Sequence, residues 1–255
     1  MLDLTGKTIL VTGASKGIGA AIASAVGAAG AHLIAHFGSD QAGAMAATSG
    51  LPAERIRLIG TNLGQTAEVD RLWSEAVAWR GRIDVLVNNA AIMRLEGGID
   101  DTDEAWDRVW DESWRVNVLA PARLMRSAVR HFEPAGGGIL ITLSSWAAQR
   151  GPGNPALLSY ASSKAAILTA TKTIARHYAK KNILAYSIAP GVVRTQLSVD
   201  AANAVGGEAA VTAGLAMGEW IPPSDIGSLV VFLASGQCRH LTGATLDVNG
   251  ASYLR

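Results

Sequence analysis

Tyr160 and Lys164 lie four residues apart within residues 159–164 (SYASSK), a segment whose composition suits a helix. Residues at positions i and i+4 share one helix face, so the two side chains are expected to lie together. An ammonium beside a phenol favours the phenolate and lowers a pKa that is ordinarily about 10. Such a tyrosine can exchange the proton that alcohol–ketone chemistry requires. The pair alone is a weak signal because it also occurs as a solvated surface pair, so its weight depends on other motifs.

A glycine-rich turn near the start of the chain provides the first of these motifs. Residues 12–19 (TGASKGIG) follow a short β-branched run at 8–11 and precede an alanine-rich segment at 20–29 with helical character. Strand, glycine turn and helix form the context in which backbone N–H groups and a helix N-terminus can bind a pyrophosphate. The spacing is Gly-x-x-x-Gly-x-Gly, not the commoner Gly-x-Gly-x-x-Gly. The alternative is a tight strand–helix turn that binds nothing.

Strands and helices alternate along the rest of the sequence. We expect helices at 68–80 and 103–132, the second interrupted before Pro121, and strands at 8–11, 32–37, 57–61, 83–87, 138–143, 184–188 and 245–248. Repeated βα units predict an α/β fold, namely a Rossmann-like, doubly wound parallel sheet of about seven strands with helices on both faces. No linker or repeat divides the chain, so we expect a single dinucleotide-binding and catalytic domain over residues 1–255.

Ligands in such folds bind beyond the carboxyl ends of the strands. Residues 88–91 (NNAA) follow the fourth expected strand, Ser144 and Ser145 end the fifth, and residues 190–195 (PGVVRT) follow the sixth. These segments should converge with the glycine turn on one crevice. Residues 196–221 lack clear periodicity and are rich in Ala and Gly, so we expect them to form a lid over that crevice.

Composition excludes several other classes of function. The chain has 255 residues, 49% of them hydrophobic, with a formal net charge of +1 and no basic tract, so neither nucleic acid nor an anionic membrane is an expected partner. Cys238 is the single cysteine, and no Cys/His cluster has the spacing of a metal site, so no metal is expected. No apolar stretch is long enough to span a bilayer, and the first strand leaves no room for a signal peptide. A cytoplasmic location is the expectation.

Together these motifs resemble the short-chain dehydrogenase/reductase family over nearly the whole chain, and within it the members similar to 3-oxoacyl-carrier-protein reductases. The resemblance implies that Tyr160 is the general acid/base and that Lys164 lowers its pKa and binds the nicotinamide ribose. It also implies that Ser145 hydrogen-bonds the substrate oxygen and that Asn117 holds a water of the proton relay. Two of these residues have simpler alternatives, because Ser145 could be a plain strand-end hydroxyl and Asn117 a polar residue inside a helix.

Cofactor choice depends on the end of the second strand. Relatives that prefer NAD place an aspartate there, and in this chain Phe37 occupies the position. Asp40 comes late enough to cap the next helix instead. Lys16 lies where NADP-preferring relatives carry a base, and Ser39 could add a hydroxyl contact; His36 is a weaker candidate. NADP(H) is therefore favoured over NAD(H).

The remaining expectations concern the full binding surface. The predicted cofactor contacts are Gly13, Ser15, Lys16, Gly17, Ile18, Gly19, Ser39, Asn62, Leu63, Asn89, Ala90, Ala91, Tyr160, Lys164, Pro190, Gly191, Val193 and Thr195, with Asn62 and Leu63 beside the adenine. The predicted substrate contacts are Met93, Ser145, Trp146 and Trp220, although packing is an equal explanation for both tryptophans. Arg94, Arg150 and Arg194 are candidates to face the mouth of the site, and the long loop at 149–155 is a candidate to shape it.

We therefore expect an NADP(H)-dependent oxidoreductase that interconverts a ketone and a secondary alcohol. An NAD-dependent dehydrogenase of a sugar, polyol or small alcohol is the alternative, and a non-catalytic nucleotide-binding regulatory protein is a more remote one. The expected partner is a small carbonyl or alcohol substrate. The resemblance also implies a homo-oligomer, either a tetramer or a dimer.

Overall fold

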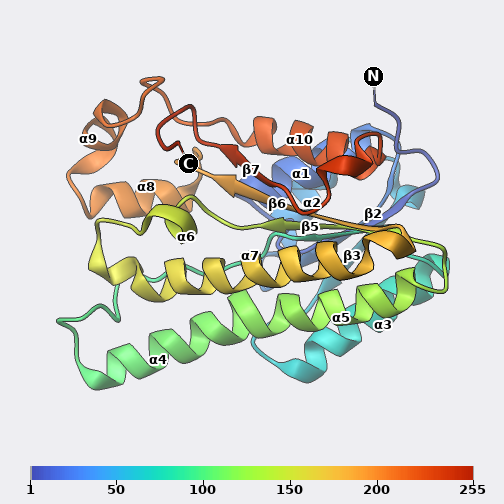
Figure 1. The fold of residues 1–255 in the computed structure, drawn as a ribbon, viewed down its shortest axis with the longest axis horizontal. Helices are drawn as coiled ribbons and strands as arrows, with labels where there is room; N and C mark the ends of the chain where they lie inside the picture. Colours follow the sequence, from blue (N-terminus) through green and yellow to red (C-terminus); the bar gives the residue numbers. More distant parts are fainter. Residues whose placement is uncertain (1, 255) are drawn as a thin grey trace.

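The computed structural model describes residues 2–254, which form one seven-stranded parallel sheet with helices on both faces (Figure 1). The strands are β1 (Thr8–Val11), β2 (His32–Phe37), β3 (Ile56–Gly60), β4 (Val85–Asn88), β5 (Gly138–Leu143), β6 (Ile183–Pro190) and β7 (Thr245–Val248). Their order across the sheet is β3-β2-β1-β4-β5-β6-β7. The order reverses between β1 and β4, and a doubly wound sheet opens a ligand crevice at that point. The predicted fold class is confirmed.

The expected strands match closely, and the differences have local causes. Expected strand 83–87 begins two residues later, at Val85, because the Ile83 N–H is hydrogen-bonded by the His131 Nε2 atom at 3.0 Å instead of by a neighbouring strand. β6 is longer than expected because it pairs with β5 and then, from Ser187, with β7.

Ten helices, together with short helical turns, connect the strands of the described chain. They are α1 (Gly17–Ala28), α2 (Gln41–Thr48), α3 (Thr66–Arg80), α4 (Asp103–Trp114), α5 (Ala120–Phe132), α6 (Ala147–Arg150), α7 (Leu158–Tyr178), α8 (Gln196–Asn203), α9 (Gly207–Ala213) and α10 (Pro223–Ser235). Among residues 2–254, no helix is both long and apolar enough to cross a membrane.

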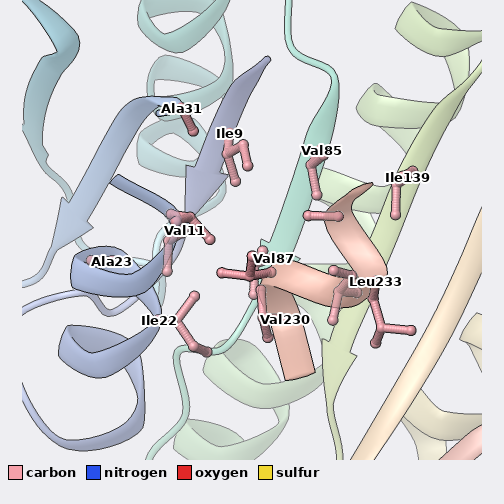
Figure 2. Packing of buried hydrophobic residues seen from close by; sticks show 14 of the residues in the cluster. Ile9, Val11, Ile22, Ala23, Ala31, Val85, Val87, Ile139, Val230 and Leu233 are labelled. Carbon is pink, nitrogen blue, oxygen red and sulfur yellow. The ribbon is translucent and has the colours of Figure 1, made fainter. Parts of the chain in front are cut away.

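Each face of the sheet has its own hydrophobic core because successive strand residues point to opposite faces. Ile9 and Val11 join the core beneath α1 and α10, whereas Leu10 between them joins the core beneath α3, α5 and α7. Figure 2 shows the first core, where Val230 of α10 packs near Val87 of β4. Burial on both faces explains why the strands are continuous apolar runs and not alternating ones.

The helix expected at 103–132 is interrupted, as predicted, before Pro121. A π-helical segment, η2 (Arg115–Leu119), separates α4 from α5, and Pro121 follows as the second residue of α5. Asn117 lies within this π-helical segment and is 2% exposed. Single π-helical turns of this kind occur frequently at functional sites.

Candidate active site

The glycine turn after β1 is hydrogen-bonded to the end of β4 through Thr12 and Asn89. The Thr12 hydroxyl accepts hydrogen bonds from the N–H groups of Asn89 and Ala90 at 3.0 and 3.1 Å. In return, the Asn89 side-chain amide donates to the carbonyls of Thr12 and Gly13 at 2.8 and 3.1 Å. Because its Nδ2 atom makes both of these bonds, the Asn89 side chain holds the turn in shape.

Two glycines of this turn are required by its geometry. Gly13 has φ +67°, a conformation that residues with a Cβ rarely adopt. A Cβ on Gly19 would lie 1.9 Å from the Gly13 carbonyl oxygen, so α1 can approach the turn this closely only without a side chain. The start of α1 and the end of β1 therefore form one compact unit.

The N-terminus of α1 has the features of an anion site. Helix α1 begins at Gly17 with no side-chain cap and no acidic residue in its first turn. Lys16 is exposed immediately before it, and no salt bridge is found for Lys16 among the described residues. Free N–H groups and the positive end of the helix dipole favour a phosphate, and Lys16 adds a positive charge beside them. The residues present fit the diphosphate of a nicotinamide dinucleotide, and Thr195, beyond β6, approaches the same turn at Gly17.

The end of β2 carries no acidic side chain free to bind a ribose. Phe37 is its last residue, Gly38 and Ser39 follow with exposed positions, and the Asp40 carboxylate accepts a hydrogen bond from the Gly43 N–H at 2.8 Å. The prediction that Asp40 caps the next helix is confirmed. His36 does not face the cofactor crevice as an ionic group, because both ring nitrogens are occupied by backbone groups.

Tyr160, Ser145 and Lys164 come together where β5 ends and α7 begins. The Ser145 hydroxyl forms a hydrogen bond that lowers the Tyr160 pKa, but burial raises that pKa more strongly, so the net shift is upward. The Lys164 Nζ atom lies 5.8 Å from the Tyr160 ring centre and donates to the Leu143 carbonyl at 2.8 Å. Burial lowers the Lys164 pKa to about 8. The expectation of a lowered Tyr160 pKa is wrong for this structure, because loss of hydration outweighs the stabilisation of the phenolate.

Asn117 connects the loop after β4 to helix α7. Its Oδ1 atom accepts from the Ile92 N–H at 2.8 Å, and its Nδ2 atom donates to the Ile92 carbonyl at 2.9 Å and to the Ser163 hydroxyl at 3.1 Å. Both hydrogens of the amide are therefore used by the protein. The Ser163 hydroxyl in turn donates to the Tyr160 carbonyl at 2.7 Å, so Asn117 helps to fix the first turn of α7.

A pocket of about 420 Å³ lies beside Tyr160. Of the predicted substrate residues, Ser145, Trp146 and Met93 line it together with Tyr160. Helix α8, at the left end of Figure 1, closes one side with Leu197, Ser198, Ala201 and Ala202, and Val205 and Val211 extend this wall. The segment expected as a lid lines this side of the pocket and forms two short helices instead of irregular chain, and its role as a lid stays a prediction.

The structure does not bring every predicted residue into the site through its side chain. Trp220 lies outside the Tyr160 pocket and lines a second cavity of about 460 Å³ near the carboxyl-terminal tail. The Leu63 and Val193 side chains are 8% and 2% exposed and belong to the two cores. The Asn62 side chain accepts from the Gly64 N–H at 2.9 Å and forms a local turn. The side chains of Asn62, Leu63 and Val193 are therefore engaged within the protein itself.

Some residues have structural roles that the sequence did not predict, including His36, which was considered only as a weak cofactor contact. Thr12 and His36 hold the glycine turn, and the Leu143 carbonyl holds Lys164; a strand residue's hydrogen-bond partner cannot be read from its type. The side of the Tyr160 pocket formed by residues 197–205 did have a recognisable pattern in the sequence. Leu197, Ala201 and Val205 are spaced four apart, the period of one helix face, and would have marked that wall.

Comparisons with known proteins agree with this geometry. A family model described as enoyl-(acyl carrier protein) reductase matches residues 13–251. The chain is 33% identical to 3beta-hydroxysteroid dehydrogenase 1 from Eggerthella lenta, over 99% of this chain and 95% of that protein. It is also 33% identical to the 3-oxoacyl-acyl-carrier-protein reductase FabG of Escherichia coli (strain K12), over 99% and 100% of the two chains.

The fold is also similar to that of a solved structure. It is a putative NAD(P)-dependent gluconate 5-dehydrogenase from Beutenbergia cavernae with bound NADP at low occupancy, 31% identical, with a TM-score of 0.88 and coverage of 98% of both chains. Sheet order, glycine turn and the Ser145–Tyr160–Lys164 cluster together define a nicotinamide-dependent oxidoreductase. The chain belongs to the short-chain dehydrogenase/reductase family, whose members act on CH–OH and carbonyl groups.

Proposed function

We propose that this protein is an NADP(H)-dependent reductase that converts a ketone to a secondary alcohol, with Tyr160 as the proton donor. The observation that carries the proposal is the apolar pocket that contains both the Ser145 hydroxyl and the Tyr160 phenol. A carbonyl oxygen placed between these two donors is polarised by both, and negative charge that develops on it is stabilised.

The hydrogen bonds of the site support these roles. The Ser145 Oγ atom accepts from the Ala147 N–H at 3.1 Å, which leaves its own hydrogen free for donation to Tyr160 or to a substrate oxygen. Burial raises the Tyr160 pKa, so near neutral pH the phenol keeps the proton that ketone reduction consumes. The bound cofactor supplies the hydride. Lys164, with one hydrogen on the Leu143 carbonyl, keeps two for the ribose hydroxyls of the cofactor.

The preference for NADP(H) rests on charge at the end of β2. Lys16 and Ser39 offer a cation and a hydroxyl, and Asp40, the acid that follows Ser39, is used as a helix cap. An aspartate that would repel a 2′-phosphate is therefore not in place. The NADP bound at low occupancy in the Beutenbergia cavernae structure also favours this cofactor.

The alternative, an NAD-dependent dehydrogenase of a sugar or polyol, has weaker support. A polyol requires several fixed donors and acceptors, whereas the pocket walls are mostly leucine, valine, alanine, proline, tryptophan and methionine. A ketone with an apolar body suits these walls better.

Two measurements test the proposal. Calorimetric titration should show that NADPH binds more tightly than NADH. Ketone reduction should be lost in Tyr160→Phe while NADPH binding is retained, because the substitution removes the proton donor and little volume. Wild-type turnover in Tyr160→Phe would refute the role of the phenol, and tighter NADH binding would refute the cofactor assignment.

A further inference from the structure

Arg150 is the one charged side chain among the described residues that line the Tyr160 pocket. It is the last residue of α6, which Gly151 ends with φ +70°. The walls around it are otherwise apolar or small, with Leu157, Val192 and Leu197 among them. A fixed cation at the edge of an apolar pocket is a strong determinant of which ligands enter it.

The position of Arg150 is set by its neighbours. Its guanidinium carbon lies 4.6 Å from the centre of the Trp146 ring, within the range of a cation–π contact. Helix α6, which Trp146 precedes and Arg150 ends, is joined to the sheet by Gln149, whose Nε2 atom donates to Asp247 of β7 at 3.0 Å. No hydrogen bond from the Arg150 guanidinium to another described residue is found, so its N–H groups stay available to an anion.

Two other arginines near the crevice show what makes Arg150 different. Arg94 is paired with Glu112 at 3.0 Å, and Arg194 with Glu208 at 2.8 Å. Neither of them lines the pocket, whereas Arg150 lines it and forms no salt bridge with any residue in the described part of the chain. A guanidinium without a carboxylate partner can form two parallel hydrogen bonds to a carboxylate or phosphate.

We propose that Arg150 is a specificity-determining residue that binds an anionic group of the substrate. The substrate class is then a ketone or secondary alcohol whose apolar body ends, away from the reacting carbon, in a carboxylate or phosphate. The carbonyl oxygen binds Ser145 and Tyr160, the body packs on the apolar walls, and the anion pairs with Arg150. This inference rests on the proposed function for the position of the carbonyl.

The test uses carboxylic acids that carry a methyl ketone at the far end of an alkyl chain, compared with their methyl esters. Native protein should reduce the acids with a kcat/KM about tenfold or more above that of the esters, mainly through a lower KM, because the anion contact is equal in ground and transition states. Arg150→Gln should lose this preference, so that its kcat/KM values for the acids fall to those for the esters. Arg150→Lys should keep part of the preference for acids, because lysine keeps the positive charge but lacks the paired N–H donors of the guanidinium.

Arg94→Gln is the matched control, since it removes one exposed arginine from the same side of the molecule and should leave the preference intact. A second arm replaces the carboxylate by a phosphate monoester, with the uncharged alcohol as its reference, and shows which anion the site prefers. Calorimetric binding of the acids and esters to native protein and Arg150→Gln provides a readout that does not require turnover.

Equal handling of acids and esters by native protein, or an unchanged preference in Arg150→Gln, overturns the inference. Tyr160-dependent turnover without any acid preference would leave the proposed function standing while this inference fails. If the acids bind in an Arg150-dependent way but turnover does not depend on Tyr160, this inference stands and the proposed function fails.

Discussion

The imidazole of His36 accepts a hydrogen bond from the Gly13 N–H at its Nδ1 atom, at 3.1 Å. Its Nε2 atom lies 3.1 Å from the Thr61 carbonyl oxygen, so the neutral ring with its hydrogen on Nε2 satisfies both partners. The ring is 2% exposed, and burial lowers its pKa to about 4. A second proton would be placed against the Gly13 N–H. His36 therefore keeps the glycine turn in place only while it is neutral.

This contact predicts a loss of stability in acid. The unfolded histidine has a pKa of about 6.5 and the folded one about 4, so the unfolded chain binds more protons between these values. The free energy of unfolding should fall as pH decreases from 6.5 to 4, with His36 contributing up to about 3 kcal/mol. Denaturant titrations across this range should show a shallower dependence on pH in His36→Gln, which keeps a donor and an acceptor but does not titrate. Equal slopes would contradict the prediction.

Lys164 should reduce stability at neutral pH. Its folded pKa is about 8 against 10.5 in the unfolded chain, so burial of the charged form costs up to about 3 kcal/mol below pH 8. Lys164→Met removes that cost and should raise the free energy of unfolding at pH 7 while abolishing turnover. The difference should shrink as pH rises from 8 to 10.5, because the native lysine is then neutral when folded. A less stable variant at pH 7 would mean that the Leu143 hydrogen bond outweighs desolvation.

The cofactor preference should depend on Lys16. Lys16→Met is expected to weaken NADPH binding by about tenfold, with little change for NADH, since only NADPH carries the extra phosphate. The NADPH difference should diminish at high salt. Lys180→Met removes the same charge just before β6, at the amino ends of the strands and away from the predicted crevice. It should change neither affinity. If Lys16→Met weakened the binding of NADPH and NADH equally, the prediction would be wrong, and Lys16 would contact the diphosphate that both cofactors share.

Trp220 should hold the lid helix α9 and not the substrate. Its Nε1 atom donates to the Thr212 hydroxyl at 2.8 Å, and the Arg194 guanidinium lies 4.9 Å from its ring centre. Thr212→Val leaves the Trp220 N–H buried without an acceptor, at a cost of about 1–3 kcal/mol. Faster hydrogen exchange in α9 and a higher KM are the expected results.

Thr173→Val is the control for this substitution. The Thr212 hydroxyl donates to the Glu208 carbonyl at 2.7 Å, and the Thr173 hydroxyl likewise donates to the Thr169 carbonyl at 3.0 Å, but Thr173 is exposed on α7. It should change neither α9 exchange nor KM. Unchanged exchange in Thr212→Val would mean that the lid is held by its apolar contacts alone.

Much of the site could be predicted because it depends on spacing along the chain. Gly13, Gly17 and Gly19 mark a phosphate turn, Tyr160 and Lys164 mark a helix face, and the strands can be read from β-branched runs. Where strand limits were wrong, a partner distant in sequence was responsible, as with His131 and Ile83. Homo-oligomerisation and a cytoplasmic location stay predictions from the resemblance and the composition.

The sequence by itself determined the order of the elements, the parallel sheet and the edge at which the functional groups collect, because these follow from local periodicity and from the handedness of βα units. Only the tertiary structure decided which side chains face the crevice. It turned Trp220 toward the lid, used Asn89 and His36 to brace the glycine turn, and left Arg150 in the pocket without a carboxylate. The physical reason is that hydration, pairing and pKa depend on neighbours that the fold brings together from distant parts of the chain.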